Sequence, residues 1–310
     1  MEEQGCSTLA AGVDGRILDR LTLAMCFRET LVYNGQESRR PRLSARAAAA
    51  RPPSIAMHKD ALICPVCRQR CSLLDVVDFN KSCEERRGTF LSPAGVPIYY
   101  AFCGGCGFCF APEMSTWSLE KFEDKVYNDD YAVVDPDYKE VRPRGNAGTL
   151  VSLFGSLPRS VRHLDYGGGN GVLVDLLRTS GWNSISYDPL VNRDVSAEQL
   201  GRFELITAFE VFEHVPDVQQ LMSHLRSLLA PDGLVLFSTL LSDGSIHRNQ
   251  RLSWWYASPR NGHISLFSRN SLALLAQNHG FHFGSFSVGC HILFSNIPPW
   301  AAHIIRVSNR

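Results

Sequence analysis

From Ser160 onward, short apolar runs alternate with segments that have the spacing of amphipathic helices. The apolar runs have the length of buried strands, and in chain order they are VRHLDY, ISYD, FELITAF and LVLFST. Between residues 217 and 229, apolar positions recur at Leu221, Leu225 and Leu228, which is the spacing of one helix face. This alternation predicts an α/β fold in which parallel strands form a sheet.

The remaining elements of this region follow from the same pattern. We expect helices over residues 172–178 and 271–277. The sequence Ala-Pro-Asp-Gly at residues 230–233 predicts a turn just before the run LVLFST. Two short strand-like runs, near residues 281–288 and 291–294, predict an antiparallel hairpin at the sheet edge.

The chain before residue 160 has a different character. Residues 1–56 end in RRPRLSARAAAARPPS, which has five arginines, no acid and an alanine run, as is typical of a disordered or low-complexity extension. Because Met57 directly precedes a cysteine-rich region, we expect the native start there and an over-extended reading frame before it. Residues 57–115 hold the cysteine-rich region. Residues 116–150 predict a helical bridge to an α/β domain over residues 151–310.

Composition narrows the choice of partners. The 310 residues are 45% hydrophobic, and 31 Lys and Arg balance 31 Asp and Glu. A chain without net charge has no overall field that favours nucleic acid or an anionic membrane. No apolar stretch reaches the roughly 18 residues that a membrane span requires, and the N-terminus lacks the segments of a signal peptide. We therefore expect a cytoplasmic protein without a membrane span, whose partner is chosen by a local site.

The sequence DYGGGNG stands where a predicted strand ends and a predicted helix begins. Glycines there permit positive φ and the close approach of a ligand, and the helix N-terminus offers unpaired N–H groups. A dinucleotide site wants G-x-G-x-x-G/A, whereas here Gly167, Gly169 and Gly171 are followed by Val172. Asp165 would also repel a pyrophosphate and attract the ammonium of a methionine group. The spacing therefore favours S-adenosylmethionine over NAD.

A second acidic residue supports this cofactor site. Asp188 ends the apolar run that follows the glycine loop. A carboxylate at that strand tip can accept hydrogen bonds from both ribose hydroxyls. Asp188 is therefore a candidate cofactor-binding residue together with Asp165 and the three glycines of the loop.

With these motifs, residues 160–300 resemble the class I S-adenosylmethionine-dependent methyltransferases, which carry D-x-G-x-G-x-G at this position. Residues 203–217 and 228–239 resemble the later motifs of that family. The resemblance implies a Rossmann-like class I methyltransferase sheet with helices on both faces. It also implies that Phe209 and Glu210 border the cofactor.

A second chemical centre is predicted after the run FELITAF. Glu210, Glu213 and His214 stand at i, i+3 and i+4, so one helical turn would place all three on one side. Two carboxylates and an imidazole can hold a divalent metal ion that lowers the pKa of a substrate hydroxyl, with His263 as a fourth ligand or a base. This ion would be a second metal, in addition to the zinc predicted below. This segment resembles that of the benzoquinol O-methyltransferases and the small-RNA 2'-O-methyltransferases.

The same residues also permit a site without metal. Glu213 and His214 would then brace the helix and line the pocket, and His214 or His263 would be the general base, because imidazole titrates near neutral pH. If the acceptor is a carbanion or a soft nucleophile, alignment alone supplies much of the acceleration. The sequence leaves these alternatives open.

Two C-x-x-C pairs lie in the cysteine-rich region. Cys64, Cys67, Cys103 and Cys106 can give four thiolates to one tetrahedral Zn²⁺, and a small module of this kind draws much of its stability from the metal. A redox role is disfavoured because no thioredoxin-like βαβ pattern surrounds either pair. We predict a zinc-ribbon-like module with structural zinc, which either docks a protein partner or roofs the acceptor pocket. Such a module before a methyltransferase domain resembles the deoxysugar C-methyltransferases.

The segment of residues 242–265 lies between a buried strand and the last predicted helix, where loops of α/β proteins carry substrate sites. Trp254, Trp255 and Tyr256 could stack on an aromatic or sugar acceptor while Arg260 holds an anionic group. In the alternative, the tryptophans anchor a lid to the core.

These features together predict S-adenosylmethionine-dependent methyl transfer to a small-molecule acceptor, at oxygen or carbon. The acceptor would be a glycan precursor, a quinone-like compound or a natural product. One alternative is metal-assisted RNA 2'-O-methylation, which the zero net charge and the lack of a basic-aromatic stripe disfavour. Another is a zinc-ribbon interaction protein whose domain binds the cofactor without turnover.

Overall fold

The computed structural model describes residues 62–155, 157 and 160–308. The extension predicted over residues 1–56 and the expected start at Met57 lie outside the described residues. In the described part of the chain, no helix is long and apolar enough to cross a membrane.

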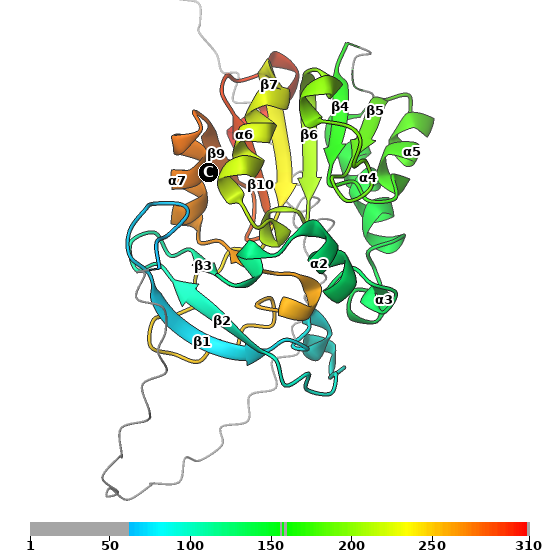
Figure 1. Cartoon of the computed structure of the whole chain (residues 1–310). Helices are drawn as coiled ribbons and strands as arrows, with labels where there is room; N and C mark the ends of the chain where they lie inside the picture. The colour runs from blue at the N-terminus through cyan, green and yellow to red at the C-terminus, as the bar shows by residue number, and fades with distance from the viewer. Residues whose placement is uncertain (1–61, 156, 158–159, 309–310) are drawn as a thin grey trace, which may run out of the picture.

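A mixed six-stranded sheet forms the centre of the α/β domain (Figure 1). The strands are β4 (Arg162–Tyr166), β5 (Asn183–Tyr187), β6 (Phe203–Phe209), β7 (Leu229–Ser238), β9 (His282–Ser285) and β10 (Cys290–Phe294). They lie in the order β5-β4-β6-β7-β10-β9, in which β4 to β7 run parallel and β10 is antiparallel to both of its neighbours. The predicted α/β fold and its antiparallel edge hairpin are confirmed.

Helices cover both faces of this sheet. They are α4 (Val141–Phe154), α5 (Val172–Thr179), α6 (Val218–Leu228), α7 (Arg269–Asn278) and α8 (Ala302–Ser308). Because side chains of a strand alternate between the faces, Leu234 and Leu236 of β7 pack into the core cluster of α4, α5 and α8. Val235 and Phe237 pack into the other cluster, with α6 and α7.

The helix boundaries follow from local capping. Asp217 is the N-cap of α6, where its carboxylate accepts hydrogen bonds from the amides of Gln219 and Gln220. Ser268 caps α7 in the same way, accepting from the amide of Ser271. Each predicted helix of this domain forms, with ends that lie within two residues of the expected ones.

A bulge within a strand replaces the turn predicted before LVLFST. Strand β7 already begins at Leu229, and its register with β6 passes from Phe203↔Leu229 to Leu205↔Leu234. Residues 230–233 therefore bulge out of a continuous strand, with Pro231 and Asp232 exposed. Because Pro231 has no N–H to give to a ladder, a bulge is compatible with its position.

The cysteine-rich region contributes to a second sheet. Its strands are β1 (Ser72–Asp78), β2 (Pro97–Phe102), β3 (Cys109–Phe110) and β8 (Ser265–Leu266), and neighbouring strands pair antiparallel in the order β1-β2-β3-β8. The last strand comes from the C-terminal half of the chain and begins two residues after His263. The cysteine-rich region and the α/β domain are therefore joined through one sheet.

The bridge region packs against this small sheet. It contains the short helices α2 (Leu119–Lys125) and α3 (Tyr131–Val134), whose buried side chains Phe122, Tyr131 and Val134 share a core cluster with β2, β3 and β8. In Figure 1 the carboxyl ends of β6 and β7 point toward α2 and the small sheet. Loops at these strand ends meet the bridge and the cysteine-rich region there.

Candidate functional site

The glycine loop connects β4 to α5 at the carboxyl edge of the sheet. Gly167, Gly169 and Gly171 all have positive φ values, between 53° and 79°. At Gly167 a side chain is also excluded by packing, because a Cβ there would lie 2.5 Å from Cγ2 of Val211. The glycines therefore allow a backbone path that a chain with side chains would not adopt.

Asp188 ties the tip of β5 to this loop. Its Oδ2 accepts a hydrogen bond from the amide of Gly169 at 3.0 Å, and its Oδ1 accepts one from the amide of Leu190 at 2.8 Å. The side chain is half-buried, so the carboxylate can still accept further hydrogen bonds from a ligand. The structure thus brings the predicted cofactor residues together.

Asp165, which was expected to attract the ammonium of a methionine group, lies beneath the loop near the end of β4. Its side chain is buried, and its Oδ1 accepts a hydrogen bond from the Thr207 hydroxyl at 2.7 Å. Burial raises the pKa of this carboxyl to about 7. A Cβ on Gly168 would lie 2.7 Å from Oδ2 of Asp165, so the carboxyl supports the loop from below.

The helical turn predicted to align Glu210, Glu213 and His214 does not form. Strand β6 ends at Phe209, Glu210 has φ +54°, and a 3₁₀ turn, η4 (Phe212–His214), follows. The hydroxyl of Ser238 accepts a hydrogen bond from the Glu210 amide and donates one to Glu210 Oε1. The expectation that Glu210 lies on the same side as Glu213 and His214 was wrong, because Ser238 binds both the backbone amide and the carboxylate of Glu210.

Glu213, His214 and His263 do converge. One potential ligand atom from each lies within 4.8 Å of the others. Among the described residues, Oε2 of Glu213 and Nδ1 of His214 are buried without a hydrogen-bond partner. Tyr256 donates its hydroxyl hydrogen to Oε1 of Glu213. The imidazole Nδ1 of His263 lies 2.8 Å from the Tyr256 carbonyl, which can only accept, so Nδ1 carries the proton and Nε2 is left as a ligand atom.

Burial sets the protonation of this cluster. It lowers the pKa of His214 to about 3, with the charge of Arg142 adding to the effect, and it lowers the pKa of His263 well below the ordinary value. Both imidazoles are therefore neutral near pH 7. Burial and the nearby Glu210 charge raise the pKa of Glu213. Two neutral imidazoles and the Glu213 carboxyl, which would release its proton when a metal binds, fit a divalent ion, with the Tyr256 carbonyl as the outer partner of one histidine.

The aromatic loop before His263 is anchored to the protein. The buried guanidinium of Arg260 donates hydrogen bonds to the Val126 carbonyl at 2.8 Å and to Oδ1 of Asn128 at 3.0 Å. The Arg86 guanidinium stacks 4.2 Å from the ring centre of Trp255. These contacts match a loop that is fixed to the bridge and the cysteine-rich region.

Two residues of the bridge that the sequence did not single out also lie at this cluster. The ring of Tyr127 lies 6.1 Å from that of His214, and Arg142 pairs with Asp135 at 2.7 Å. Burial disfavours the charge of Arg142, but Glu210 and Asp135 hold its pKa above the ordinary value. The abundance of Tyr and Asp in the bridge was the available signal for their role.

The four predicted cysteines form a compact cluster. Their sulfur atoms lie within 4.8 Å of one another, with 3.6 Å between Cys64 and Cys106 and 3.3 Å between Cys67 and Cys103. Cys109 lies in a different core cluster, beyond this group. The spacing of the sulfurs fits the tetrahedral thiolate set that Zn²⁺ prefers.

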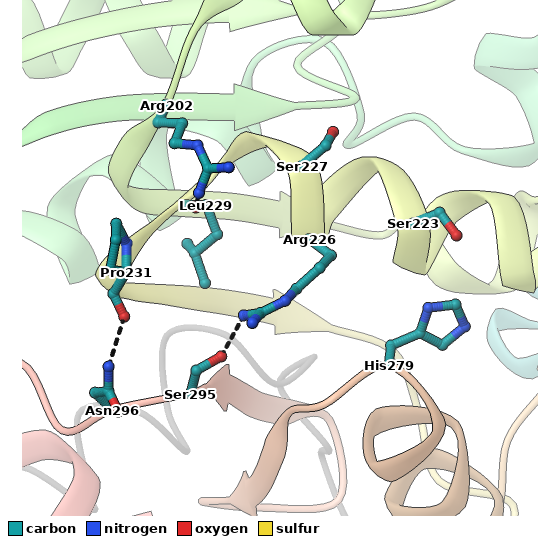
Figure 2. Close-up of a pocket in the computed structure, with 9 residues that line it drawn as sticks. All are labelled: Arg202, Ser223, Arg226, Ser227, Leu229, Pro231, His279, Ser295 and Asn296. Atoms are coloured by element: carbon teal, nitrogen blue, oxygen red, sulfur yellow. Dashed lines mark hydrogen bonds between the residues drawn. The ribbon is translucent and has the colours of Figure 1, made fainter.

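A cavity of about 480 Å³ lies at the opposite end of the large sheet (Figure 2). Its lining includes Arg202, which precedes β6, and Leu229, at the start of β7. Arg226 donates a hydrogen bond to Ser295 across it. None of the predicted site residues lines this cavity, so it is separate from the candidate site.

Comparisons with known proteins agree with this geometry. Residues 138–283 match the family model described as "Methyltransferase domain". Over 93 residues the chain is 30% identical to a ubiquinone biosynthesis O-methyltransferase of Colwellia psychrerythraea, a match that covers 30% of this chain and 38% of that protein. It is 28% identical to the enzyme of the same name from Bordetella avium, over 29% of this chain and 47% of the relative. The chain thus spans less than half the length of these curated relatives.

Solved structures show a lower similarity. Magnesium protoporphyrin IX methyltransferase from Synechocystis PCC 6803, with bound SAH, matches with 17% identity and a TM-score of 0.33, over 49% of this chain and 80% of that one. The family match falls on the part of the chain that holds the glycine loop, Asp188 and the Glu213–His214 turn. Over residues 138–283 this chain is therefore similar to methyltransferase domains.

Proposed function

We propose that this chain transfers a methyl group from S-adenosylmethionine to a small-molecule acceptor, at oxygen or carbon. The observation that carries the proposal is the contact between the glycine loop and the segment of Glu213, through Gly167 and Val211. A cofactor at the loop and an acceptor at the cluster of Glu213, His214 and His263 would be neighbours. Methyl transfer requires such proximity.

The cofactor side would act by binding and orientation. Asp188 has lone pairs for the ribose hydroxyls, and the glycine loop lets the ligand approach the backbone at the start of α5. Asp165 would keep the loop in shape from below. Bound S-adenosylmethionine supplies a methyl group on a positively charged sulfur.

The acceptor side would lower the pKa of a hydroxyl. Glu213, His214 and His263 would hold a divalent ion, which when bound supplies a Lewis acid for that oxygen. The acceptor hydroxyl would give its proton to water, its oxygen would form a bond to the methyl carbon, and the carbon–sulfur bond would break with its electron pair left on sulfur. The unpartnered, buried Oε2 of Glu213 supports this assignment over a purely structural cluster.

The names of the relatives favour a quinone-like phenol as the first compound to test, with glycan precursors and natural products next. The zero net charge disfavours a nucleic acid. We also propose structural Zn²⁺ at Cys64, Cys67, Cys103 and Cys106.

Calorimetry with S-adenosylhomocysteine tests the cofactor site. We expect the wild type to bind, Asp188→Ala to bind more weakly, and Gly169→Arg not to bind, because a long side chain would fill the ligand's path. Asp175→Ala is a control, since this acid lies on α5 but pairs with Arg178 at the surface. A wild type that does not bind would refute the proposal.

Metal dependence needs a separate experiment. Divalent ions other than zinc are removed with a chelator, and retention of zinc is checked by elemental analysis. Methylation of a phenolic acceptor should then stop and should return when Mg²⁺ or Mn²⁺ is added. Activity that survives this treatment would show that Glu213, His214 and His263 work without metal.

A further inference from the structure

We propose that the four-cysteine zinc site is a positioning element of the acceptor centre, because it fixes the segment that carries His263. The inference rests on the proposed function for the role of His263, whereas the mechanical link can be tested independently. It assigns the cysteine-rich region to the wall of the active site. It does not require a protein partner.

The first link runs from the second cysteine pair through the small sheet. The turn that holds Cys103 and Cys106 leads directly into β3, which pairs with β8 through Cys109↔Leu266 and Phe110↔Ser265. Next to this pairing, the amide of Ala111 donates to the carbonyl of Ile264 at 2.9 Å. The backbone on the C-terminal side of His263 is therefore built onto the cysteine-rich region.

Further bonds hold His263 and the residues that follow it. The hydroxyl of Tyr100, in β2, donates to the carbonyl of His263 itself at 2.7 Å. The hydroxyl of Ser268, beyond β8, donates to the carbonyl of Cys106 at 2.6 Å. A Cβ on Gly107 would lie 2.7 Å from that same hydroxyl, so the turn that holds Cys103 and Cys106 is in close contact with Ser268.

The first cysteine pair, Cys64 and Cys67, packs against the helices that follow the candidate ligands Glu213, His214 and His263 along the chain. The carbonyl of Pro65 accepts a hydrogen bond from Nε2 of Gln219, in the first turn of α6, at 2.7 Å. The carbonyl of Val66 accepts one from Nδ2 of Asn278, at the end of α7, at 3.2 Å. Helix α6 follows the turn of Glu213 and His214, so one metal site connects the segments of all three candidate ligands.

Three backbone carbonyls in the two C-x-x-C pairs therefore accept hydrogen bonds from within the chain. The carbonyls of Pro65, Val66 and Cys106 accept from α6, from α7 and from the cap of α7. A module whose main function is to dock a partner would present such groups outward. Since structural zinc supplies folding free energy to small modules, its loss would release these contacts together.

The test compares Cys67→Ser with the wild type by hydrogen exchange and by metal binding. Cys67 is the half-buried member of the four, and Cys71→Ser is the matched control because Cys71 lies nearby without belonging to the cluster. We expect loss of zinc, faster amide exchange over residues 254–268, and unchanged exchange over residues 163–175. Affinity for S-adenosylhomocysteine should change by less than about twofold.

The acceptor centre is followed by Mn²⁺ binding in electron paramagnetic resonance, since this hard cation prefers imidazole and carboxylate to thiolate. We expect about tenfold weaker Mn²⁺ binding in Cys67→Ser, the size seen when outer partners of metal ligands are lost. Gly107→Ala is a second variant, which keeps all four cysteines, strains the backbone at φ +78° and pushes on Ser268. It should retain zinc and still weaken Mn²⁺ binding.

Unchanged exchange over residues 254–268 after zinc loss would overturn the inference, and so would an equal increase throughout the chain. If Cys67→Ser does not fold, Gly107→Ala decides by the same readouts. If the wild type binds neither S-adenosylhomocysteine nor Mn²⁺, the proposed function fails, while the exchange data still show whether zinc fixes the His263 segment.

Discussion

The cofactor side and the acceptor side of the candidate site are each held by hydrogen bonds, and the sequence separation of the bonded residues differs greatly between the two sides. On the cofactor side, Gly169 donates to Asp188, 19 positions away, and Thr207 donates to Asp165, 42 positions away. On the acceptor side, the amide of Cys83 donates to Asn261, 178 positions away. Lys81 reaches the carbonyl of Trp254 across 173 positions.

This difference shows which parts can be disturbed separately. The cofactor loop is a property of one strand-loop-helix unit and its neighbouring strand. The acceptor centre exists only when the cysteine-rich region, the bridge and the C-terminal loop are assembled. Variants aimed at one side should therefore leave the other intact, and a variant that disturbs both would contradict this separation.

The largest effect is expected from Gly262→Ala, on the acceptor side. Gly262 has φ +86°, and a Cβ there would lie 3.2 Å from Nδ1 of His214 and 3.3 Å from the hydroxyl of Tyr127. Displacing His214 by a fraction of an ångström should reduce methyl transfer by about 100-fold. Binding of S-adenosylhomocysteine should stay within about twofold of the wild type.

Gly244→Ala is the matched control for this variant. Gly244 has φ +77° and lies in the same long loop, but a Cβ there would meet nothing within 4 Å. It imposes a similar backbone strain without crowding the centre. Equal losses of activity in both variants would assign the effect of Gly262→Ala to strain in the loop rather than to His214.

Gly168→Ala disturbs the cofactor side instead. A Cβ at this position would collide with the hydroxyl of Ser186 and lie 2.7 Å from Oδ2 of Asp165, and overpacking of this kind costs about 1–3 kcal/mol. We expect affinity for S-adenosylhomocysteine to fall by about 30-fold in calorimetry, with Mn²⁺ binding unchanged. Gly148→Ala, in α4 with open space around it, should change neither quantity.

The sequence predicted where the glycine loop and Asp188 lie in the fold. The glycine loop and Asp188 could be assigned because strand, loop and helix follow one another and the bonds between them are short in sequence. The burial of the Asp165 side chain could not be predicted, since it depends on Thr207 of a neighbouring strand. A motif names its residues but does not show which of them face the ligand.

On the acceptor side the residue types were predictable and their arrangement was not. Glu210 left the expected group because Ser238, 28 positions away, captures its amide and its carboxylate. The contact of Tyr127 with His214 requires the bridge to fold over the strand ends. The cysteine spacing predicted a metal cluster but gave no sign that its carbonyls would dock on α6 and α7.

The acid sensitivity of the fold should depend on two residues that contact Thr207. Burial lowers the pKa of His163 to about 3, so below pH 6.5, the ordinary value, the unfolded chain binds more protons and stability falls. Burial raises the pKa of Asp165 to about 7, so as pH falls through 7 the folded chain gains the proton first and stability rises.

Substitutions at these two residues should therefore act in opposite directions. We compare the change in the free energy of unfolding between pH 7 and pH 5 with that of the wild type. His163→Gln should make this change about 2 kcal/mol more favourable to the folded state, and Asp165→Asn should make it less favourable by a similar amount. Urea unfolding at a series of pH values measures both. Shifts of the same sign in the two variants would contradict the assigned protonation states.

The smallest effect is expected from Tyr256→Phe, which tests the acceptor centre without adding any atom. The Tyr256 hydroxyl donates to Oε1 of Glu213 and accepts from the amide of Leu240 at 3.4 Å. Without it the carboxylate can turn, and Oε2 is no longer fixed toward the two histidines. Losing an outer partner of this kind should weaken Mn²⁺ binding by about tenfold, with cofactor affinity unchanged.

Tyr131→Phe is the control, because this tyrosine is also buried and its hydroxyl bonds to Asp135 at 3.5 Å, away from Glu213. Electron paramagnetic resonance with Mn²⁺ and calorimetry with S-adenosylhomocysteine are run on both variants. If Tyr256→Phe weakened the binding of both ligands equally, the cofactor side and the acceptor side of the site would be one cooperative unit. If it weakened neither, Glu213 would hold its position through backbone contacts such as the bond from the Ile264 amide to its carbonyl.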